Sequence, residues 1–318
     1  MFTIVQNRKW YFLLSLIIIV PGILAMIYNV ATLPTRSPWR LSVDFREGNR
    51  FELKFQQPIS EDQLRQTFVA NGISSPQITH VGAPTDNSWQ VRTEYVEGDK
   101  AQDIREALSK VVPLDEGATS VQSVSKAVAD QVTTTAIVAV IASSILILLF
   151  IWITFRKANH SFRYSVAAII AMIHDVLVAA GVMAILSVVL GWEIDALFLT
   201  AILTVIGFSV PDTIVVYDRI RENLGRYRGQ DFETIVSRSI VETLHRSLTI
   251  SLVNMLVMFA ILVFGGASIR HFVAVLLIGL LSGTYSSIFT AVPLVVAWET
   301  GDLLGNKRGA RKTAVQAS

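Results

Sequence analysis

An aspartate and a proline stand next to each other inside a long apolar run of this 318-residue chain. Asp212 follows an uncharged stretch that begins at residue 196, and Pro211 precedes it directly. A carboxylate in hydrocarbon costs roughly 2.5–3.5 kcal/mol on insertion scales, so such a residue is expected to face protein and to have a function. Proline lacks a backbone donor and leaves the carbonyl of Gly207 without its helical partner. Together with Ser209, one turn earlier, these groups predict a site that holds water and a proton.

A candidate partner for this aspartate lies at the entrance of the next apolar run, where residues 235–251 include Arg246. If the two helices are neighbours, Arg246 and Asp212 lie at similar depth, since Asp212 stands about one and a half turns inside its span. An arginine favours the charged form of a nearby carboxylate, and its withdrawal favours the protonated form. The pair is therefore a candidate proton switch. Two alternatives stay open: Asp212 is a structural ion-pair partner, or Arg246 only extends to the interface and marks the inner side.

Two further ionisable residues, His174 and Asp175, fall near the middle of another span. Asp175 is expected to face the helix bundle, where it joins a proton path or bonds a helix backbone, and His174 is expected to be packed and hydrogen-bonded. Asp212, Arg246 and Asp175 are thus the candidate proton-coupling residues. Two groups of polar or small residues are interpreted as helix packing, with a water path as the second interpretation of the first group: Ser247, Ser251 and Asn254, and Gly279, Ser282, Gly283 and Ser286.

Composition indicates a membrane protein. The chain is 52% hydrophobic and 16% charged, whereas a soluble domain has about 25% charged residues. It has no cysteine, which excludes disulfides, thiolate catalysis and cysteine-based metal sites. Its five histidines form no metal-binding pattern. We therefore expect no metal, no cofactor, no nucleic-acid partner and no enzymatic activity.

Six stretches are long enough to cross a hydrocarbon core, which takes roughly 20 apolar residues per helix. The first is too long for a signal peptide and lacks a convincing cleavage site, so we interpret it as a retained span. The fold class is therefore a polytopic α-helical membrane protein with six transmembrane helices. The stretches lie near residues 10–33, 132–155, 164–190, 194–217, 247–264 and 272–298.

Basic residues predict the orientation of these spans. By the positive-inside rule, the side that carries most of them is the cytoplasm, which places both termini there and the chain in the plasma (inner) membrane. The residues on that side are Arg8, Lys9, Arg156, Lys157, Arg163, Arg219, Arg221, Arg226, Arg228, Arg238, Lys307, Arg308, Arg311 and Lys312. The predicted domains are residues 1–33 (N-terminus and first span), 34–131 (extracytoplasmic), 132–298 (five spans, with a cytoplasmic loop at 218–246) and 299–318 (cytoplasmic tail). The charged part of that loop is expected to form a surface helix.

The extracytoplasmic segment has the pattern of a small α+β domain. Ser60 and Gln63 form a capping box before a helical stripe. The order of elements, β-α-β-β-α-β, is that of a ferredoxin-like domain between the first two spans. Its acidic residues are interpreted as a solvated surface, so the domain is expected to contact another molecule rather than to catalyse. The expected strands are 41–55 (one strand or a turn-broken pair), 77–81, 89–96 and 119–124, the helices are 60–71 and 100–112, and a turn covers 82–88.

These motifs resemble those of the SecF family, membrane subunits of the bacterial Sec protein-export machinery that are related to the RND family of proton-driven transporters. Residues 206–224 are similar to the family pattern IGYS-x-N-D-T-IVV-x-DRIREN, and the resemblance extends over essentially the whole chain through His174-Asp175-Val176, 243–251 and 43–48. Two places differ. Pro211 stands where the family has asparagine, and residues 121–124 lack the family's Gly-Pro turn before the second span.

The resemblance implies an accessory subunit beside the SecY channel complex. With SecD, a second six-span protein, it would use proton movement to help draw preproteins across the lipid bilayer. Asp212 would be the proton-carrying acid and Arg246 its regulating partner, while SecD would contribute another intramembrane aspartate. Two other interpretations stay open. One is a stand-alone or homodimeric RND-like proton-driven exporter of lipids or small molecules, which would need to self-pair. The other is an intramembrane hydrolase built on Asp175 or Asp212, for which no second catalytic motif is convincing.

Overall fold

The computed structural model describes residues 4–81, 86–155 and 161–302, and the chain divides into two compact units. Unit 1 is Met1–Arg40 together with Ala139–Ser318, and unit 2 is Leu41–Val138. Some of the sequence-based predictions lie outside the described residues: Arg156, Lys157, the basic residues of the C-terminal tail and part of the turn at 82–88.

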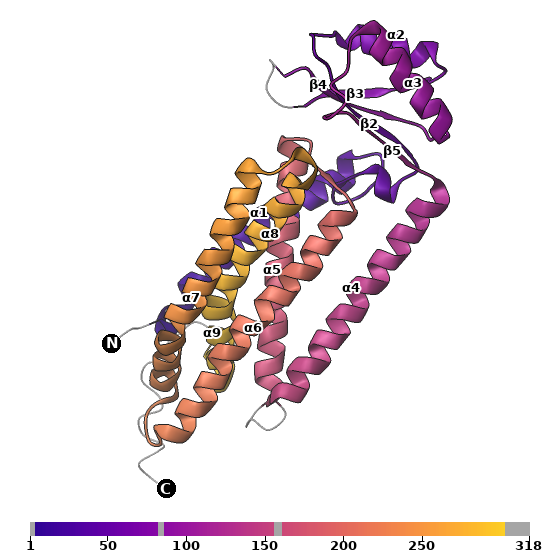
Figure 1. Ribbon diagram of the computed structural model, residues 1–318. Coiled ribbons are helices and arrows are strands. Elements are labelled where there is room, and N and C mark those ends of the chain that lie inside the picture. Colours follow the sequence, from indigo (N-terminus) through magenta and orange to yellow (C-terminus); the bar gives the residue numbers. More distant parts are fainter. Residues whose placement is uncertain (1–3, 82–85, 156–160, 303–318) are drawn as a thin grey trace. The chain divides into compact units, whose positions relative to one another are not determined.

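Six helical spans of the described chain are long and apolar enough to cross a membrane, which confirms the six predicted from hydropathy (Figure 1). A helix satisfies its own backbone donors and acceptors, as a segment in lipid must. The spans are α1 (Arg8–Thr32, preceded by the 3-10 turn η1, Val5–Asn7), α4 (Lys126–Phe155), α5 (Ser161–Val189), α6 (Ala196–Arg226), α7 (Phe232–Phe264) and a last span made of α8 (Ala267–Ser286), the π-helical segment η3 (Ser287–Ala291) and α9 (Val292–Thr300). The short strand β6 (Glu193–Ile194) lies between α5 and α6.

The charged segment after the fourth span differs from the prediction. α6 continues to Arg226 and α7 already begins at Phe232, so residues 218–246 are mostly the ends of these two helices rather than a loop with its own surface helix. Asp231 caps α7 by accepting a hydrogen bond from the backbone N–H of Thr234. The two helices therefore form a long antiparallel hairpin with a short connection.

Small residues set how closely the helices of unit 1 pack. α8 contacts α5, α6 and α7, and α1 packs along α5. A Cβ atom added at Gly22 of α1 would lie 2.6 Å from the Cα atom of Gly181 in α5, so neither position has room for a side chain. A Cβ atom at Gly279 of α8 would overlap the side chain of Val205 in α6. α1 and α5 are thus packed backbone against backbone, and α8 makes room for a side chain of α6.

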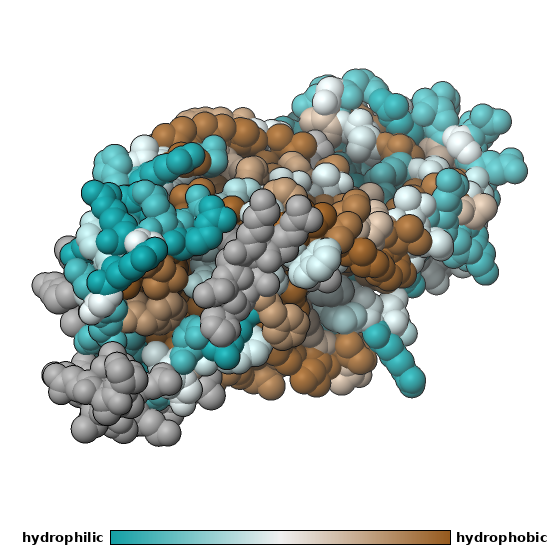
Figure 2. Space-filling model, turned by 90° about the horizontal axis from the view of Figure 1, so that it is seen from below, coloured by the Kyte–Doolittle hydropathy of each residue, from teal (hydrophilic) through white to brown (hydrophobic). Residues whose placement is uncertain are grey.

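Apolar side chains cover the outside of the bundle. Large hydrophobic residues of α1, α4 and α7 are exposed, among them Leu24, Leu146 and Leu256, each at least 60% exposed. In Figure 2 hydrophobic residues spread over a broad part of the face presented, and hydrophilic ones gather apart from them. Soluble monomers rarely expose so extended an apolar surface. Since hydrocarbon is the solvent that suits these faces, the chain is a multi-pass membrane protein.

Ion pairs tie the helix ends of unit 1 together. Arg8, 1% exposed, binds Glu233 at the start of α7 (2.9 Å) and approaches the carboxylate of Asp302, just beyond α9 (3.5 Å). Arg8 also donates two hydrogen bonds to the backbone carbonyl of Asp302. Arg163 of α5 pairs with Glu299 of α9 at 2.7 Å. The basic residues predicted to mark one side of the membrane therefore also cross-link the helices.

Unit 2 contains a four-stranded antiparallel sheet in the order β3-β4-β2-β5. Its elements are β2 (Gly48–Lys54), α2 (Glu61–Ala70), β3 (Gln77–His80), β4 (Ser88–Thr93), α3 (Gly98–Val111) and β5 (Ser120–Val124). Phe51 of β2, Phe68 of α2 and Leu108 of α3 belong to one buried cluster, so both helices pack on the same core. The predicted capping box at Ser60 and Gln63 is confirmed.

Residues 41–55 were predicted to form one strand or a turn-broken pair of strands, and the structure shows the second alternative. Val43–Phe45 form the 3-10 turn η2 between β1 (Arg40–Leu41) and β2. The alternation of apolar residues holds within β2, where Phe51 and Leu53 are buried in the core. Gly48, at φ 149°, begins β2, and a Cβ there would lie 2.8 Å from the carbonyl of Thr93, so the position requires glycine.

Candidate intramembrane functional site

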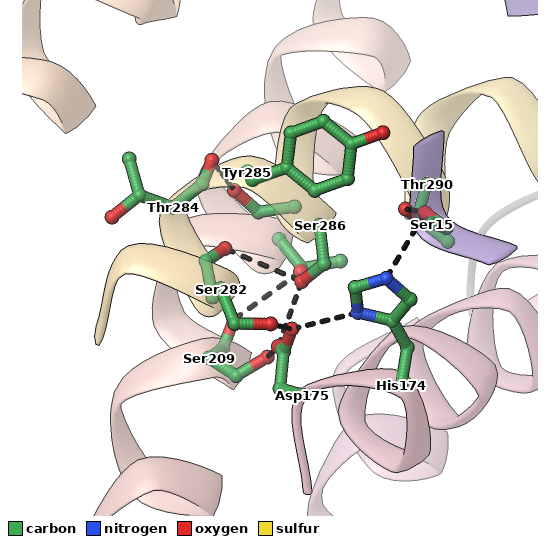
Figure 3. Close-up of polar contacts among 12 residues, drawn as sticks. Ser15, His174, Asp175, Ser209, Ser282, Thr284, Tyr285, Ser286 and Thr290 are labelled. Atoms are coloured by element: carbon green, nitrogen blue, oxygen red, sulfur yellow. Dashed lines mark hydrogen bonds and ion pairs between the residues drawn. The ribbon is translucent and has the colours of Figure 1, made fainter. Parts of the chain in front are cut away.

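Asp175 of α5 is wholly buried at the centre of a cage of hydroxyl groups (Figure 3). Its Oδ2 atom accepts hydrogen bonds from Ser209 of α6 (2.6 Å) and Ser286 of α8 (2.7 Å). Its Oδ1 atom accepts one from Ser282 of α8 (2.7 Å). The carboxylate therefore connects three neighbouring helices through short, charge-assisted hydrogen bonds, which are about twice as strong as neutral ones. We call these residues, together with His174, the Asp175 cage.

His174 extends the Asp175 cage towards α1. Its Nδ1 atom lies 3.1 Å from Oδ1 of Asp175, and its Nε2 atom lies 3.0 Å from the hydroxyl of Ser15. The Ser15 hydroxyl in turn lies 3.4 Å from that of Thr290, in the π-helical segment η3. The prediction of a packed, hydrogen-bonded histidine is confirmed. π-Helical segments occur often at functional sites, and this one adjoins the cage.

The number of partners in the Asp175 cage matches what a carboxyl group can accept. Three hydroxyls and the Nδ1 atom of His174 lie within hydrogen-bond distance, and a carboxylate offers about four lone-pair positions. The contacts from Asp175 to His174 and from His174 to Ser15 repeat the Asp–His–Ser arrangement of a hydrolytic triad. However, Ser15 is only 7% exposed and packed between helices, so a substrate has no access to its hydroxyl.

Asp212 lies at the interface between α6 and α7, in different surroundings. Its side chain is half-buried, and the hydroxyl of Ser251 lies 3.5 Å from its Oδ2 atom. Ser247, 2% exposed, interacts with the same carboxylate but falls short of hydrogen-bond geometry, so its hydroxyl has no hydrogen-bond partner within the described chain. Asp212 is thus far less saturated with donors than Asp175.

Arg246 does not pair with Asp212 in this structure. It lies on α7, directly before Ser247, and its side chain is exposed. Its guanidinium interacts with the Asp212 carboxylate electrostatically, yet no ion pair within 4.0 Å joins the two among the described residues. The structure therefore puts Asp212 and Arg246 on neighbouring helices and leaves them apart.

Ser209 has a different partner from the one that the sequence suggested. It was grouped with Asp212 because it precedes that residue by about one helical turn. Its side chain instead donates a hydrogen bond to Asp175 of α5. Helical spacing alone does not tell which of two adjacent helices a serine faces.

Several residues of the Asp175 cage were missed or assigned to packing. Ser282 and Ser286 were interpreted only as small residues that let helices approach, and Ser15 and Thr290 were not singled out. A signal was present: a buried aspartate needs several donors, and two serines four residues apart on an apolar helix present two hydroxyls to one side. Among the described residues, no group of three or more His, Cys, Asp or Glu is placed to hold a metal ion.

Comparisons with known proteins match the chain over nearly its full length. Residues 103–301 match the family described as "Protein export membrane protein SecD/SecF, C-terminal". The "Protein translocase subunit SecF" of Thermobaculum terrenum is 41% identical over 96% of this chain and 96% of its own length. That of Anaerolinea thermophila is 39% identical over 98% of this chain and 99% of its own length.

A solved structure has the same fold. SecDF of Thermus thermophilus, described as a translocon-associated membrane protein, matches with a TM-score of 0.77 at 27% sequence identity. A SecDF structure in a form called super-membrane-facing matches with a TM-score of 0.62 at the same identity. Each match covers 94% of this chain but only 39% of the SecDF chain, so the chain spans about two-fifths of that protein.

Proposed function

This chain belongs to the SecF family of protein translocase subunits, and from that premise we propose that it is an accessory subunit of the Sec translocase that, with SecD, couples proton movement across the membrane to the export of preproteins. Two findings support the proposal. The relatives named as translocase subunits align over nearly the whole chain, and the solved relative is a SecDF protein described as translocon-associated. The SecY channel complex, SecD, the translocating preprotein and the lipid bilayer are the proposed partners.

The observation that carries the proton-coupling part is the environment of Asp212. A membrane-embedded carboxylate with few donors is poised between its charged and neutral forms, whereas a saturated one is held in a single form. The hydroxyl of Ser251 lies 3.5 Å from the Oδ2 atom of Asp212, and the hydroxyl of Ser247, which has no hydrogen-bond partner among the described residues, also interacts with this carboxylate. A water that bridges these groups would have three polar partners, which is the usual number for a buried water. Asp212 is the proposed proton-carrying acid, reached through water at Ser247.

Arg246 is the proposed regulating partner. It lies close enough to Asp212 to interact electrostatically, and a long flexible side chain can approach or leave a carboxylate one helix away. When Arg246 approaches, it favours the charged carboxylate and releases the proton; when it withdraws, Asp212 takes up a proton. Such alternation lets proton binding and release occur in different conformations of the same interface.

Unit 2 is the proposed outer domain. Its element order β-α-β-β-α-β and its sheet order support a ferredoxin-like domain on the extracytoplasmic side, between the first two spans. With both termini in the cytoplasm, it would face the compartment into which preproteins emerge. There the membrane helices would move this domain.

The test compares Asp212→Asn with Asp218→Asn in inverted membrane vesicles that contain the chain assembled with SecD. Both changes remove one carboxylate charge from α6, but Asp218 is 61% exposed and paired with Arg221 at the helix surface. We expect Asp212→Asn to lose the part of preprotein translocation that an imposed proton gradient adds, with ATP-driven translocation and assembly intact. Asp218→Asn is expected to keep both. Full gradient dependence in Asp212→Asn would refute the proton-coupling proposal.

A further inference from the structure

α6 is attached to different neighbours before and after Pro211. Before it, Ser209 donates its hydroxyl to Asp175 and so binds the α5 and α8 side of the bundle. After it, Arg219 binds Glu242 of α7 at 2.6 Å. Asn223, wholly buried, donates to Glu242 at 2.8 Å as well. The side-chain hydrogen bond of the first half therefore joins it to Asp175 of α5, and those of Arg219 and Asn223 in the second half join it to α7.

The division between the two halves falls at a weak point of the helix. Pro211 has no backbone N–H, so one hydrogen bond of the helical ladder is missing at this turn, and sharp bends in helices occur mostly at proline. Asp212 follows directly and faces Ser247 and Ser251 of α7, with Arg246 beside them. A change of charge at Asp212 therefore occurs next to Pro211, the point at which α6 bends most easily.

The attachment of the first half is rigid. Asp175 is 0% exposed, and all its hydrogen-bond partners are buried: Ser209, Ser282, Ser286 and its neighbour His174. Among the described residues, Ser209 supplies the only side-chain hydrogen bond from α6 to this carboxylate. The others come from α8 and from α5 itself. Ser209 is therefore the link between the helix that carries Asp212 and the saturated cage.

The second half of α6 has partners on two sides. Arg219 and Asn223 form charge-assisted hydrogen bonds with Glu242 of α7. On the other side, the buried Tyr217 packs on Tyr164 of α5, with ring centroids 5.0 Å apart, and its hydroxyl donates to the carbonyl of Ala291 in η3 (3.1 Å). A bend at Pro211 would shift this half of α6 relative to α5.

From this arrangement we propose that Ser209 is a positioning residue for proton coupling: its hydrogen bond to Asp175 fixes the first half of α6, so that proton uptake at Asp212 becomes a bend at Pro211 rather than a displacement of the whole helix. In this role Asp175 stays a fixed anchor and carries no transported proton. The proposal rests on the proposed function of Asp212. Without the link at Ser209, Asp212 still binds its proton, but the movement is absorbed by sliding of α6.

Two serines of the cage provide a matched test. Ser209→Ala and Ser286→Ala each remove one hydroxyl from the same Oδ2 atom, at 2.6 and 2.7 Å, and both serines are buried. Only Ser209 lies on α6. In the vesicle assay with SecD present, we expect Ser209→Ala to reduce the gradient-dependent part of translocation about tenfold, the factor that corresponds to one charge-assisted hydrogen bond. Ser286→Ala should keep most of it, and Ser209→Thr, which retains the hydroxyl, should keep it too.

A second readout follows the movement itself. The chain has no cysteine, so spin labels can be placed at Arg221→Cys in the second half of α6 and at Phe162→Cys in α5, positions that are 54% and 67% exposed. We expect the distance between the labels to change between pH 5 and pH 8 in the parent and in Ser286→Ala, and not in Ser209→Ala. If Ser209→Ala does not assemble, Ser209→Cys, whose thiol is a weak donor, takes its place in the vesicle assay.

The outcomes separate the two proposals. If Asp212→Asn responds fully to the gradient, the proposed proton-coupling function fails. If Asp212→Asn loses the response but the Ser209 and Ser286 variants behave alike, proton coupling stands and the role of Ser209 is refuted, because the cage is then only a structural element. A pH-dependent distance change that persists in Ser209→Ala refutes the role as well.

Discussion

At the scale of single residues, two aspartates inside the same bundle have opposite environments. Asp175 is wholly buried and receives hydrogen bonds from three serines and a histidine, whereas Asp212 is half-buried with one serine at 3.5 Å. From the sequence alone both carboxylates are costly to place in the membrane and both are candidate functional residues. The sequence shows how far along a span each one lies, but not which donors surround it. This difference in donors is the basis for proposing Asp175 as an anchor and Asp212 as the proton carrier.

This contrast predicts unequal effects of the same chemical change. Asp175→Asn replaces an acceptor by an amide whose N–H groups face existing donors, so we expect a loss of about 3 kcal/mol in the free energy of unfolding. Asp212→Asn loses one long hydrogen bond and a carboxylate that is costly in lipid, so we expect a change within about 0.5 kcal/mol or a slight gain. Thermal unfolding in detergent, followed by tryptophan fluorescence, measures both. Equal destabilisation of the two variants would contradict the assignment of Asp175 as the anchor.

At the scale of helices and strands, the sequence predicts those features that are determined by residues close together in the chain. Hydropathy locates all six spans, and the Ser60–Gln63 capping box locates the start of α2. Prediction from the sequence fails where a side chain has its hydrogen-bond partner far away in the chain. Ser209 faces Asp175 rather than Asp212, and the charged segment after α6 extends the helix because Arg219 and Asn223 find Glu242 on α7. The π-helical turn of η3 has no signature in composition.

The basic residues at the start of α1 give a prediction at this scale. The positive-inside rule treats Arg8 and Lys9 alike, but Arg8 is 1% exposed and joins α1 to Glu233 and to Asp302, while Lys9 is exposed. We expect Arg8→Ala to lower the free energy of unfolding by about 2 kcal/mol, since it leaves buried acceptors without their donor. Lys9→Ala is the matched control and should change it by less than about 0.5 kcal/mol. Similar losses in both variants would mean that the ion pairs of Arg8 contribute little.

At the scale of the whole molecule, the proposed mechanism requires unit 2 to lie outside the cytoplasm. In that mechanism proton coupling would act on the helices of unit 1, and unit 2 would contact the preprotein on the outer side. The positive-inside rule predicts this orientation from the distribution of basic residues between the loops. The opposite orientation would bring unit 2 into the cytoplasm, where it could not receive an emerging chain.

Labelling of two engineered cysteines tests that orientation, because the chain contains none of its own. Gln102 lies on α3 of unit 2 and Gln230 lies in the short link between α6 and α7; both are exposed, so they form a matched pair. With a membrane-impermeant maleimide, we expect Gln102→Cys to react after the outer face of the plasma membrane is made accessible, and Gln230→Cys to react only after the membrane is permeabilised. The reverse pattern would place unit 2 in the cytoplasm and exclude a direct role in receiving preproteins. Reaction at both sites before permeabilisation would instead indicate leaky membranes, and a cytoplasmic enzyme followed in the same samples detects such leakage.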